Sequence, residues 1–272
     1  MPCVICGKSQ ELNVYGKLTK CNTCGLIYYN KYSGSIDVKS LYQEGYFTGE
    51  EYLDYKKDKI IIQKNFSFRL REIQAYVKDG SLFEIGCAYG FFLELAQKYF
   101  KVEGIDIALI PTLFASKDLC LDVSATNYLD FYLPDKKDVI CVWDTIEHLE
   151  KPHEFIKKIN LELNDGGYLF LTTGDIGSML AKIRGEKWRM IHPPTHLFYF
   201  SKNTITRLLN QHGFKVISIR YPGVYRSLKQ IVWSLFFANR VYPDYFEKII
   251  NKIDFPVYIN TFDIMMVVAR KI

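Results

Sequence analysis

One segment constrains the fold more than any other, an apolar stretch that enters a small-residue turn and continues directly as a helical pattern. It reads Ser81-Leu-Phe-Glu-Ile-Gly-Cys-Ala-Tyr-Gly90 and is followed by the apolar run Phe91 to Phe100. Small residues let the backbone approach a ligand closely, and the N-terminus of the following helix presents N–H groups. The arrangement is typical of nucleotide-binding α/β folds. The candidate ligand-contacting residues of this turn are Glu84, Gly86, Cys87, Ala88 and Gly90.

Strand and helix patterns alternate along the rest of the chain. Strands are expected at 82–85, 102–105, 121–125, 139–143, 168–172, 214–221 and 262–269. Helical patterns at 91–100, 111–116, 152–163 and 203–211 separate most of them. Such alternation predicts a parallel sheet with helices on both faces, and the last two strands are expected to close it as an antiparallel hairpin. We therefore predict an α/β, Rossmann-like fold with a seven-stranded, mostly parallel sheet.

The second of these strands ends in Asp106, twenty residues after Gly86. A carboxylate at this distance from the turn can accept hydrogen bonds from both ribose hydroxyls of an adenosine. Dehydrogenases that bind NAD share this feature, but their turn usually reads Gly-x-Gly-x-x-Gly. The turn from Gly86 to Gly90 closes sooner, which favours an amino-acid-bearing nucleoside over a pyrophosphate.

Two Cys-x-x-Cys pairs stand near the N-terminus, each followed closely by a glycine. Cys3, Cys6, Cys21 and Cys24 can present four thiolates from two tight turns, which is the ligand set of a structural Zn²⁺ site. The alternative, a redox or disulfide set, is rare in the cytosol. So short a segment buries little apolar surface, so the metal would supply its folding energy. We predict a zinc ribbon over residues 1–32, a tyrosine-rich helical segment over 33–78 and the α/β domain over 79–272.

Composition and charge limit the cellular location and the class of substrate. Apolar residues make up 49% of the chain, yet no apolar run approaches the roughly 20 residues that span a bilayer. The N-terminus has no signal-peptide pattern, so a cytoplasmic location is expected. The formal net charge of +5 tolerates an anionic substrate but does not indicate nucleic-acid binding.

A helical insertion is expected at about 225–257, where apolar and basic residues are mixed. It fits a cap on the core, a dimer interface, or a segment that makes peripheral contact with a membrane. The oligomeric state stays open.

Over about residues 40 to 222 the chain resembles class I S-adenosylmethionine-dependent methyltransferases. The resemblance rests on Glu84–Gly90, Gly104–Asp106, the block Asp138–Leu149 and the segment Leu163–Thr173. It implies that the first motif holds the methionine part of S-adenosylmethionine and that Asp106, with Ile107 beside it, holds the ribose. It further implies an adenine contact for Asn127, where the family usually has Asp. Trp143 and Asp144 would line the methionine end, and Tyr46 would cover the cofactor.

The layout as a whole is similar to deoxysugar and surface-polysaccharide methyltransferases, which combine a four-cysteine ribbon with this core. The deoxysugar C-methyltransferases carry a Glu-His-Leu-x-Tyr-Phe-Ser segment, and this chain has Thr195-His-Leu-Phe-Tyr-Phe-Ser201. The missing glutamate disfavours carbon methylation, which needs a strong base, whereas oxygen methylation needs a base of near-neutral pKa. His196 or His192 would be that base, and His148 is a third candidate. A helix-capping or packing role is the alternative for His196 and His148.

These features favour O-methylation of a sugar, nucleotide-linked or within a surface glycan, so the expected partner is a small-molecule or glycan acceptor. Sugar C- or N-methylation stays open. Methylation of rRNA or another nucleic acid also stays open, because some rRNA methyltransferases carry a zinc ribbon. The aromatic residues Trp188, His192, Phe198, Tyr199 and Phe200 form either a wall that stacks on a sugar ring or part of the core.

Overall fold

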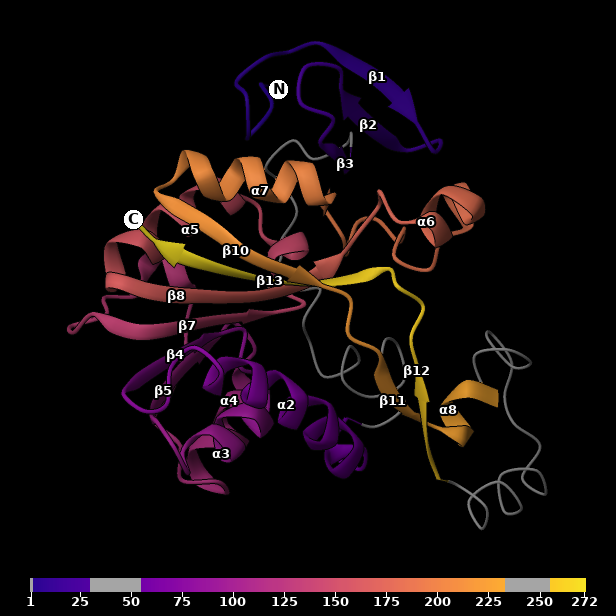
Figure 1. Cartoon of the computed structure of the whole chain (residues 1–272). Coiled ribbons are helices and arrows are strands. Elements are labelled where there is room, and N and C mark those ends of the chain that lie inside the picture. The colour runs from indigo at the N-terminus through magenta and orange to yellow at the C-terminus, as the bar shows by residue number, and fades with distance from the viewer. Residues whose placement is uncertain (1, 30–54, 233–254) are drawn as a thin grey trace.

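The computed structural model describes residues 2–29, 55–232 and 255–272 (Figure 1). The strands are β1 (Glu11–Val14), β2 (Leu18–Cys21), β3 (Ile27–Tyr29), β4 (Ser81–Ile85), β5 (Lys101–Asp106), β6 (Val123–Ala125), β7 (Lys137–Trp143), β8 (Leu163–Gly174), β9 (Phe198–Tyr199), β10 (Phe214–Arg220), β11 (Val224–Ser227), β12 (Pro256–Ile259) and β13 (Ile264–Lys271). The α-helices are α2 (Lys59–Gln74), α3 (Phe91–Ala96), α4 (Leu109–Lys117), α5 (Pro152–Glu162), α6 (Met179–Arg184), α7 (Lys202–Gln211) and α8 (Leu228–Val232). Short 3₁₀ turns are η2 (Tyr128–Asp130), η3 (Ile146–His148) and η4 (Gly185–Lys187).

The central sheet has seven strands in the order β10-β13-β8-β7-β4-β5-β6. Its neighbours from β8 to β6 pair in parallel, whereas β13 pairs antiparallel with both β8 and β10. The predicted Rossmann-like sheet and its closing antiparallel hairpin are therefore confirmed. The strand order reverses between β4 and β7, and in such sheets ligands bind at the carboxyl ends of the strands beside this point.

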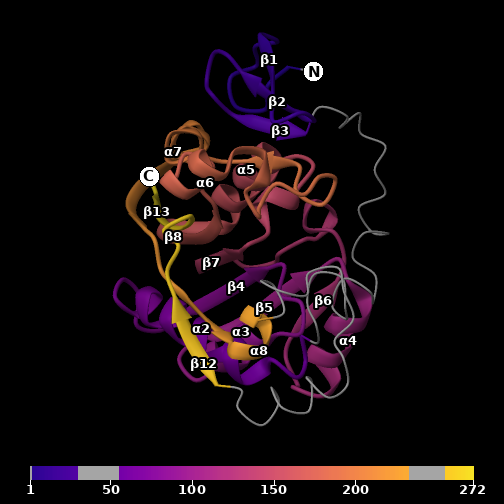
Figure 2. The same cartoon turned by 90° about the vertical axis from the view of Figure 1, so that its right-hand side faces the viewer.

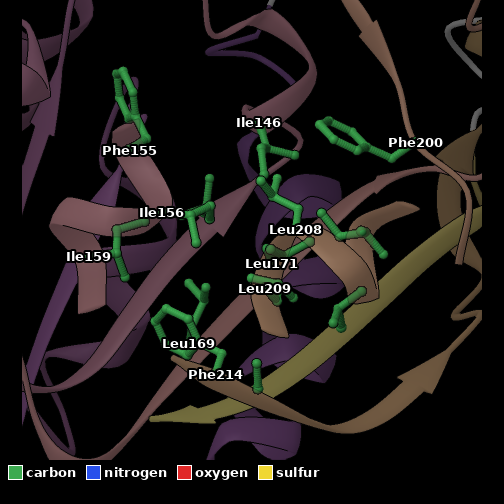
Figure 3. Packing of buried hydrophobic residues seen from close by; sticks show 14 of the residues in the cluster. Ile146, Phe155, Ile156, Ile159, Leu169, Leu171, Phe200, Leu208, Leu209 and Phe214 are labelled. Atoms are coloured by element: carbon green, nitrogen blue, oxygen red, sulfur yellow. The ribbon is translucent and has the colours of Figure 1, made fainter. Parts of the chain in front are cut away.

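Alternate residues of the central strands pack on opposite faces of the sheet. On one face Ile140 and Val142 of β7 join the buried apolar residues of α5 and α7, as Figure 3 shows for part of this cluster. On the other face Val139, Cys141 and Trp143 pack against α2, α3 and α4. Because both faces are covered, the strands read as nearly continuous apolar runs.

The N-terminal ribbon, residues 2–29, joins the rest of the molecule through backbone pairing. Its strands β1, β2 and β3 form a sheet with β9, in which Ile27 pairs with Tyr199 and Tyr28 with Phe198. The ribbon lies above α5, α6 and α7 (Figure 2). Its buried residues Cys3, Ile5, Cys21 and Leu26 belong to the same apolar cluster as Leu197 and Phe200.

Two predicted segments are described only in part. The tyrosine-rich helical segment expected over 33–78 is described from residue 55, and its helix α2 begins at Lys59. The tyrosines Tyr42, Tyr46 and Tyr52 lie outside the described residues. The described ends of the insertion form the antiparallel pair β11–β12, with α8 following β11. In the described part of the chain, every helix is too short or too polar to cross a bilayer.

Candidate cofactor and acceptor site

The turn between β4 and α3 is tightly folded. The N–H groups of Gly86 and Cys87 donate to the carbonyl of Ile105 at 2.8 and 3.1 Å, so the turn is tied to the end of β5. Gly86, Ala88 and Gly90 all have positive φ, at 82°, 43° and 71°. A Cβ at position 86 would lie 2.5 Å from Oγ1 of Thr145, so glycine is required there by contact as well as by conformation.

Asp106 holds this turn against β5. One carboxylate oxygen accepts from the N–H of Ala88 and the other from the N–H of Ala108, both at 2.8 Å. Desolvation raises the pKa of Asp106, while the N–H groups of Ala108 and Ala88 act in the opposite direction. Each oxygen keeps a second lone pair, so the carboxylate can also accept hydroxyl donors. Ile107 follows it and is half-buried.

Two buried polar atoms beside the turn find no hydrogen-bond partner among the described residues. They are Oε2 of Glu84, at the end of β4, and Nε1 of Trp143, at the end of β7. Burial and the nearby Asp106 raise the pKa of Glu84 well above its ordinary value. A buried polar group without a hydrogen bond lowers the stability of a folded protein, so such groups typically bind a ligand or a water molecule. An acceptor and a donor in this position fit the amino-acid end of S-adenosylmethionine.

Arg69 is a site residue that sequence patterns did not indicate. From α2 its Nη2 donates to Oδ2 of Asp144 at 2.8 Å, and its guanidinium lies 5.0 Å from the ring centroid of Trp143. Asp144 itself has a positive φ of 47°, directly after β7. The only sequence signal was a cation placed among apolar residues of α2.

Tyr46, predicted to cover the cofactor, lies outside the described residues. Among the described residues, one tyrosine from the same side of the chain packs on aromatic residues of the turn. Tyr55 stacks on Tyr89 and Phe91, each at 5.6 Å between ring centroids. Asn127 follows β6 as predicted, and its Oδ1 accepts from the N–H of Leu129 at 3.1 Å, capping η2.

The three candidate histidines are brought together. The ring centroids of His148 and His196 are 4.5 Å apart, and those of His192 and His196 are 3.8 Å apart. They lie next to the cofactor turn, because Thr145 contacts Gly86 of that turn and η3, which contains His148, begins directly after Thr145. His192 and His148 are half-buried, whereas His196 is buried.

Burial separates these histidines chemically. Desolvation lowers the pKa of His148 to about 4 and that of His196 well below its ordinary value. Glu147 is buried beside them, and desolvation followed by the Asp144 charge raises its pKa to about 8. His196 does not cap a helix: Ser201 and Thr204 form the capping box of α7.

The aromatic residues around His196 belong to the core. Trp188, Phe198, Tyr199 and Phe200 expose at most 4% of their surface, and they pack between the ribbon and the α/β domain. A sugar-stacking wall built from these four is therefore wrong, because their rings are already covered by protein.

The four N-terminal cysteines converge as the spacing predicts. Sγ of Cys3 lies 3.4 Å from Sγ of Cys24, Sγ of Cys6 lies 3.5 Å from Sγ of Cys21, and all four sulfurs lie within 4.8 Å of one another. Tetrahedral Zn²⁺ with Zn–S bonds of about 2.3 Å needs sulfurs roughly 3.8 Å apart, so the donor set fits the ion.

Comparison with known proteins shows to which family the chain belongs. A family model described as a methyltransferase domain matches residues 58–219, from α2 to β10. The chain belongs to this methyltransferase family. It is therefore an S-adenosylmethionine-dependent methyltransferase with the class I fold.

Solved structures share the fold of this methyltransferase at low identity. An S-adenosylmethionine-dependent methyltransferase from Archaeoglobus fulgidus has a TM-score of 0.55 at 18% identity, over 80% of this chain and 99% of that one. Magnesium protoporphyrin IX methyltransferase from Synechocystis PCC 6803, solved with bound S-adenosylhomocysteine, has a TM-score of 0.54 at 14% identity, over 86% and 100%. A methyltransferase from Clostridium acetobutylicum has a TM-score of 0.53 at 10% identity, over 80% and 96%. No curated protein matches the chain.

Proposed function

We propose that this methyltransferase transfers the methyl group of S-adenosylmethionine to a hydroxyl of a sugar, nucleotide-linked or within a surface glycan. The observation that carries the proposal is the histidine cluster beside the cofactor turn. It brings the half-buried imidazole of His192 close to the cofactor turn, and an imidazole base suits a hydroxyl acceptor better than a carbon acid.

The cofactor residues follow from the site. Asp106 would accept the ribose hydroxyls, with Ile107 and Asn127 towards the adenine, and the turn from Gly86 to Gly90 would follow the ligand backbone. Glu84, Trp143 and Asp144 would hold the amino-acid end, with Arg69 near its carboxylate. S-adenosylmethionine supplies an electrophilic methyl group on a sulfonium.

His192 is the best-placed general base of the three histidines. A base works best when its pKa is near the working pH, and the pKa of about 4 makes His148 a weak one. His196 is disfavoured by burial for the same reason. His192 is half-buried, so it can take the hydroxyl proton and pass it to water.

The ribbon would hold one structural Zn²⁺ through Cys3, Cys6, Cys21 and Cys24. Its role is architectural, because β3 of the ribbon pairs with β9, two residues after His196. The metal would thus stabilise the segment that carries the acceptor-side histidines.

A labelled-methyl experiment tests the proposal. The full chain is incubated with S-adenosylmethionine carrying a ¹³C methyl group and a panel of nucleotide sugars and glycan fragments. The expected product is a methyl ether, whose carbon chemical shift differs from that of a methyl bound to carbon or nitrogen. Label on carbon, on nitrogen or in added rRNA would contradict the proposal. His192→Gln should lower kcat by about 100-fold or more while S-adenosylhomocysteine binding is retained. The control His212→Gln, at the C-cap of α7, should leave kcat unchanged.

A further inference from the structure

Three titratable side chains behind His192 have no role in the proposed proton transfer. They are Glu147 and His148 in η3 and His196 in the loop before β9, and one ligand atom from each lies within 4.8 Å of the others. Glu147 is 2% exposed and His196 is 5% exposed. We call this group the Glu147 triad.

The carboxylate of Glu147 is the unexplained group. Neither Oε1 nor Oε2 makes a hydrogen bond of good geometry within the described residues, although both are buried and the side chain of Thr173 lies near enough to favour the ionised form and lower the pKa of Glu147. A buried carboxylate without donors is strongly destabilising unless it is protonated or meets a cation. Its neighbours in the triad are two imidazoles, which commonly share a metal ion with a carboxylate.

Backbone carbonyls orient both imidazoles. Nδ1 of His148 lies 2.9 Å from the carbonyl oxygen of Thr195, and Nδ1 of His196 lies 2.9 Å from that of Met190. In His196, an Nδ1–H that donates to the carbonyl of Met190 fixes the tautomer in which Nε2 carries the lone pair, the usual outer support of metal-binding histidines.

The two segments of the triad are also pinned to each other. The N–H of Leu197 donates to the carbonyl of Glu147 at 2.9 Å, beside the contact between His148 and Thr195. The ligand positions therefore do not depend on a mobile loop, and the site is preorganised.

We propose that the Glu147 triad binds a first-row divalent metal ion, separate from the cysteine site. Two imidazole nitrogens and one carboxylate are a ligand set for Zn²⁺ and Fe²⁺ that leaves coordination positions open. The ion would bind the carboxylate of Glu147 and a nitrogen of each imidazole. The catalytic role of this ion rests on the proposed sugar methylation. An open coordination position facing His192 would bind the acceptor hydroxyl and lower the pKa of that hydroxyl, and His192 would receive its proton.

Cobalt loading of the full chain separates the two metal sites. After chelation, the protein is dialysed against Co²⁺ alone, metal is counted by mass spectrometry, and the absorption spectrum is recorded. The thiolate site gives a sulfur-to-cobalt charge-transfer band, whereas the triad gives only d–d bands. We expect about two ions per chain in the unsubstituted protein and about one in Glu147→Gln and in His196→Asn, with the thiolate band intact.

Two controls make the result decisive. His212→Asn should keep both ions, and Cys3→Ser with Cys6→Ser should lose the charge-transfer band while the d–d bands remain. S-adenosylhomocysteine binding reports folding of each variant. One ion per chain in the unsubstituted protein, or two ions in both triad variants, would overturn the proposal. Metal counting needs no acceptor, so a loaded triad in a protein that methylates no sugar would refute only the proposed function.

Discussion

Arg69 and Asp144 form an ion pair of 2.8 Å between Nη2 and Oδ2 that links α2 to the carboxyl end of β7. The guanidinium is 13% exposed and lies over Trp143, whereas the Asp144 side chain is 42% exposed. The pair thus places the cation of Arg69, from helix α2, next to Trp143 and Asp144, the two residues expected at the methionine end of the cofactor. A buried cation there would attract the cofactor carboxylate.

Replacing Arg69 should therefore weaken cofactor binding. Arg69→Met keeps the stem over Trp143 but removes the charge, and we expect the Kd for S-adenosylhomocysteine to rise about 10- to 100-fold. Calorimetric titration measures it. Arg71→Met on the same helix, which stacks on Phe68 instead, is the matched control. Equal Kd values for the two variants would remove Arg69 from the site.

Gly90 should tolerate no side chain. Its φ is 71°, and a Cβ would lie 2.6 Å from Leu121 and 3.0 Å from Ala115. We expect Gly90→Ala to lower the free energy of unfolding by about 2–4 kcal/mol, combining backbone strain with overpacking. Gly16→Ala, with φ 67° and its nearest atom at 4.0 Å, isolates the strain and should cost about 1 kcal/mol. Urea unfolding compares them, and similar losses would show that contact at Gly90 is unimportant.

Chelation of the Zn²⁺ proposed for the ribbon should loosen the acceptor side without releasing the cofactor. The N–H of Tyr29 donates to the carbonyl of Leu197 at 2.8 Å, so β9 depends on β3. Amide exchange is expected to rise at 18–29 and 197–199 after chelation and to stay slow in β7. Substituting the exposed Cys120 by Ser should change neither region. Unchanged exchange at 27–29 would show that the ribbon folds without metal.

Asp138 should make stability pH-dependent in acid. Desolvation opposes its ionisation, but hydrogen bonds from Ser81 and Asn164 outweigh this and lower its pKa below 3.8. The unfolded state then binds more protons, so this stabilisation is complete above about pH 5 and is lost as the pH falls towards the folded-state pKa. Urea unfolding between pH 3 and 6 should show a shallower slope for Asp138→Asn and for Ser81→Ala. An unchanged slope in both variants would show that the Asp138 carboxylate is not the source of the pH dependence of stability.

The strands could be predicted from sequence because they are short apolar runs bounded by turn residues. The main misjudged boundary is that of β8: the sequence predicts a strand at 168–172, whereas β8 begins at Leu163 and includes Asp165, Gly166 and Gly167. Residue type alone does not show that this segment continues the ladder, since Leu163 pairs with Lys137 across the sheet.

Long-range partners could not be predicted. Arg69 looks like any helix cation until α2 is placed over Trp143, and Glu147 looks solvent-exposed until β9 covers it. The same holds for Trp188 and Phe198, whose burial requires the ribbon to pack on the domain. The cysteine cluster was predictable because spacing alone defines its ligand set.

Binding of S-adenosylhomocysteine to Asp106 variants tests the central claim most directly. Asp106 accepts from Ala88 and Ala108 and would also take the ribose hydroxyls. Calorimetry should show one S-adenosylhomocysteine bound per chain, a Kd raised about 10- to 100-fold by Asp106→Ala, and no change for the exposed Asp118→Ala. Absence of binding to the unsubstituted chain, or equal Kd values for Asp106→Ala and Asp118→Ala, would contradict the assignment of this turn as the cofactor site.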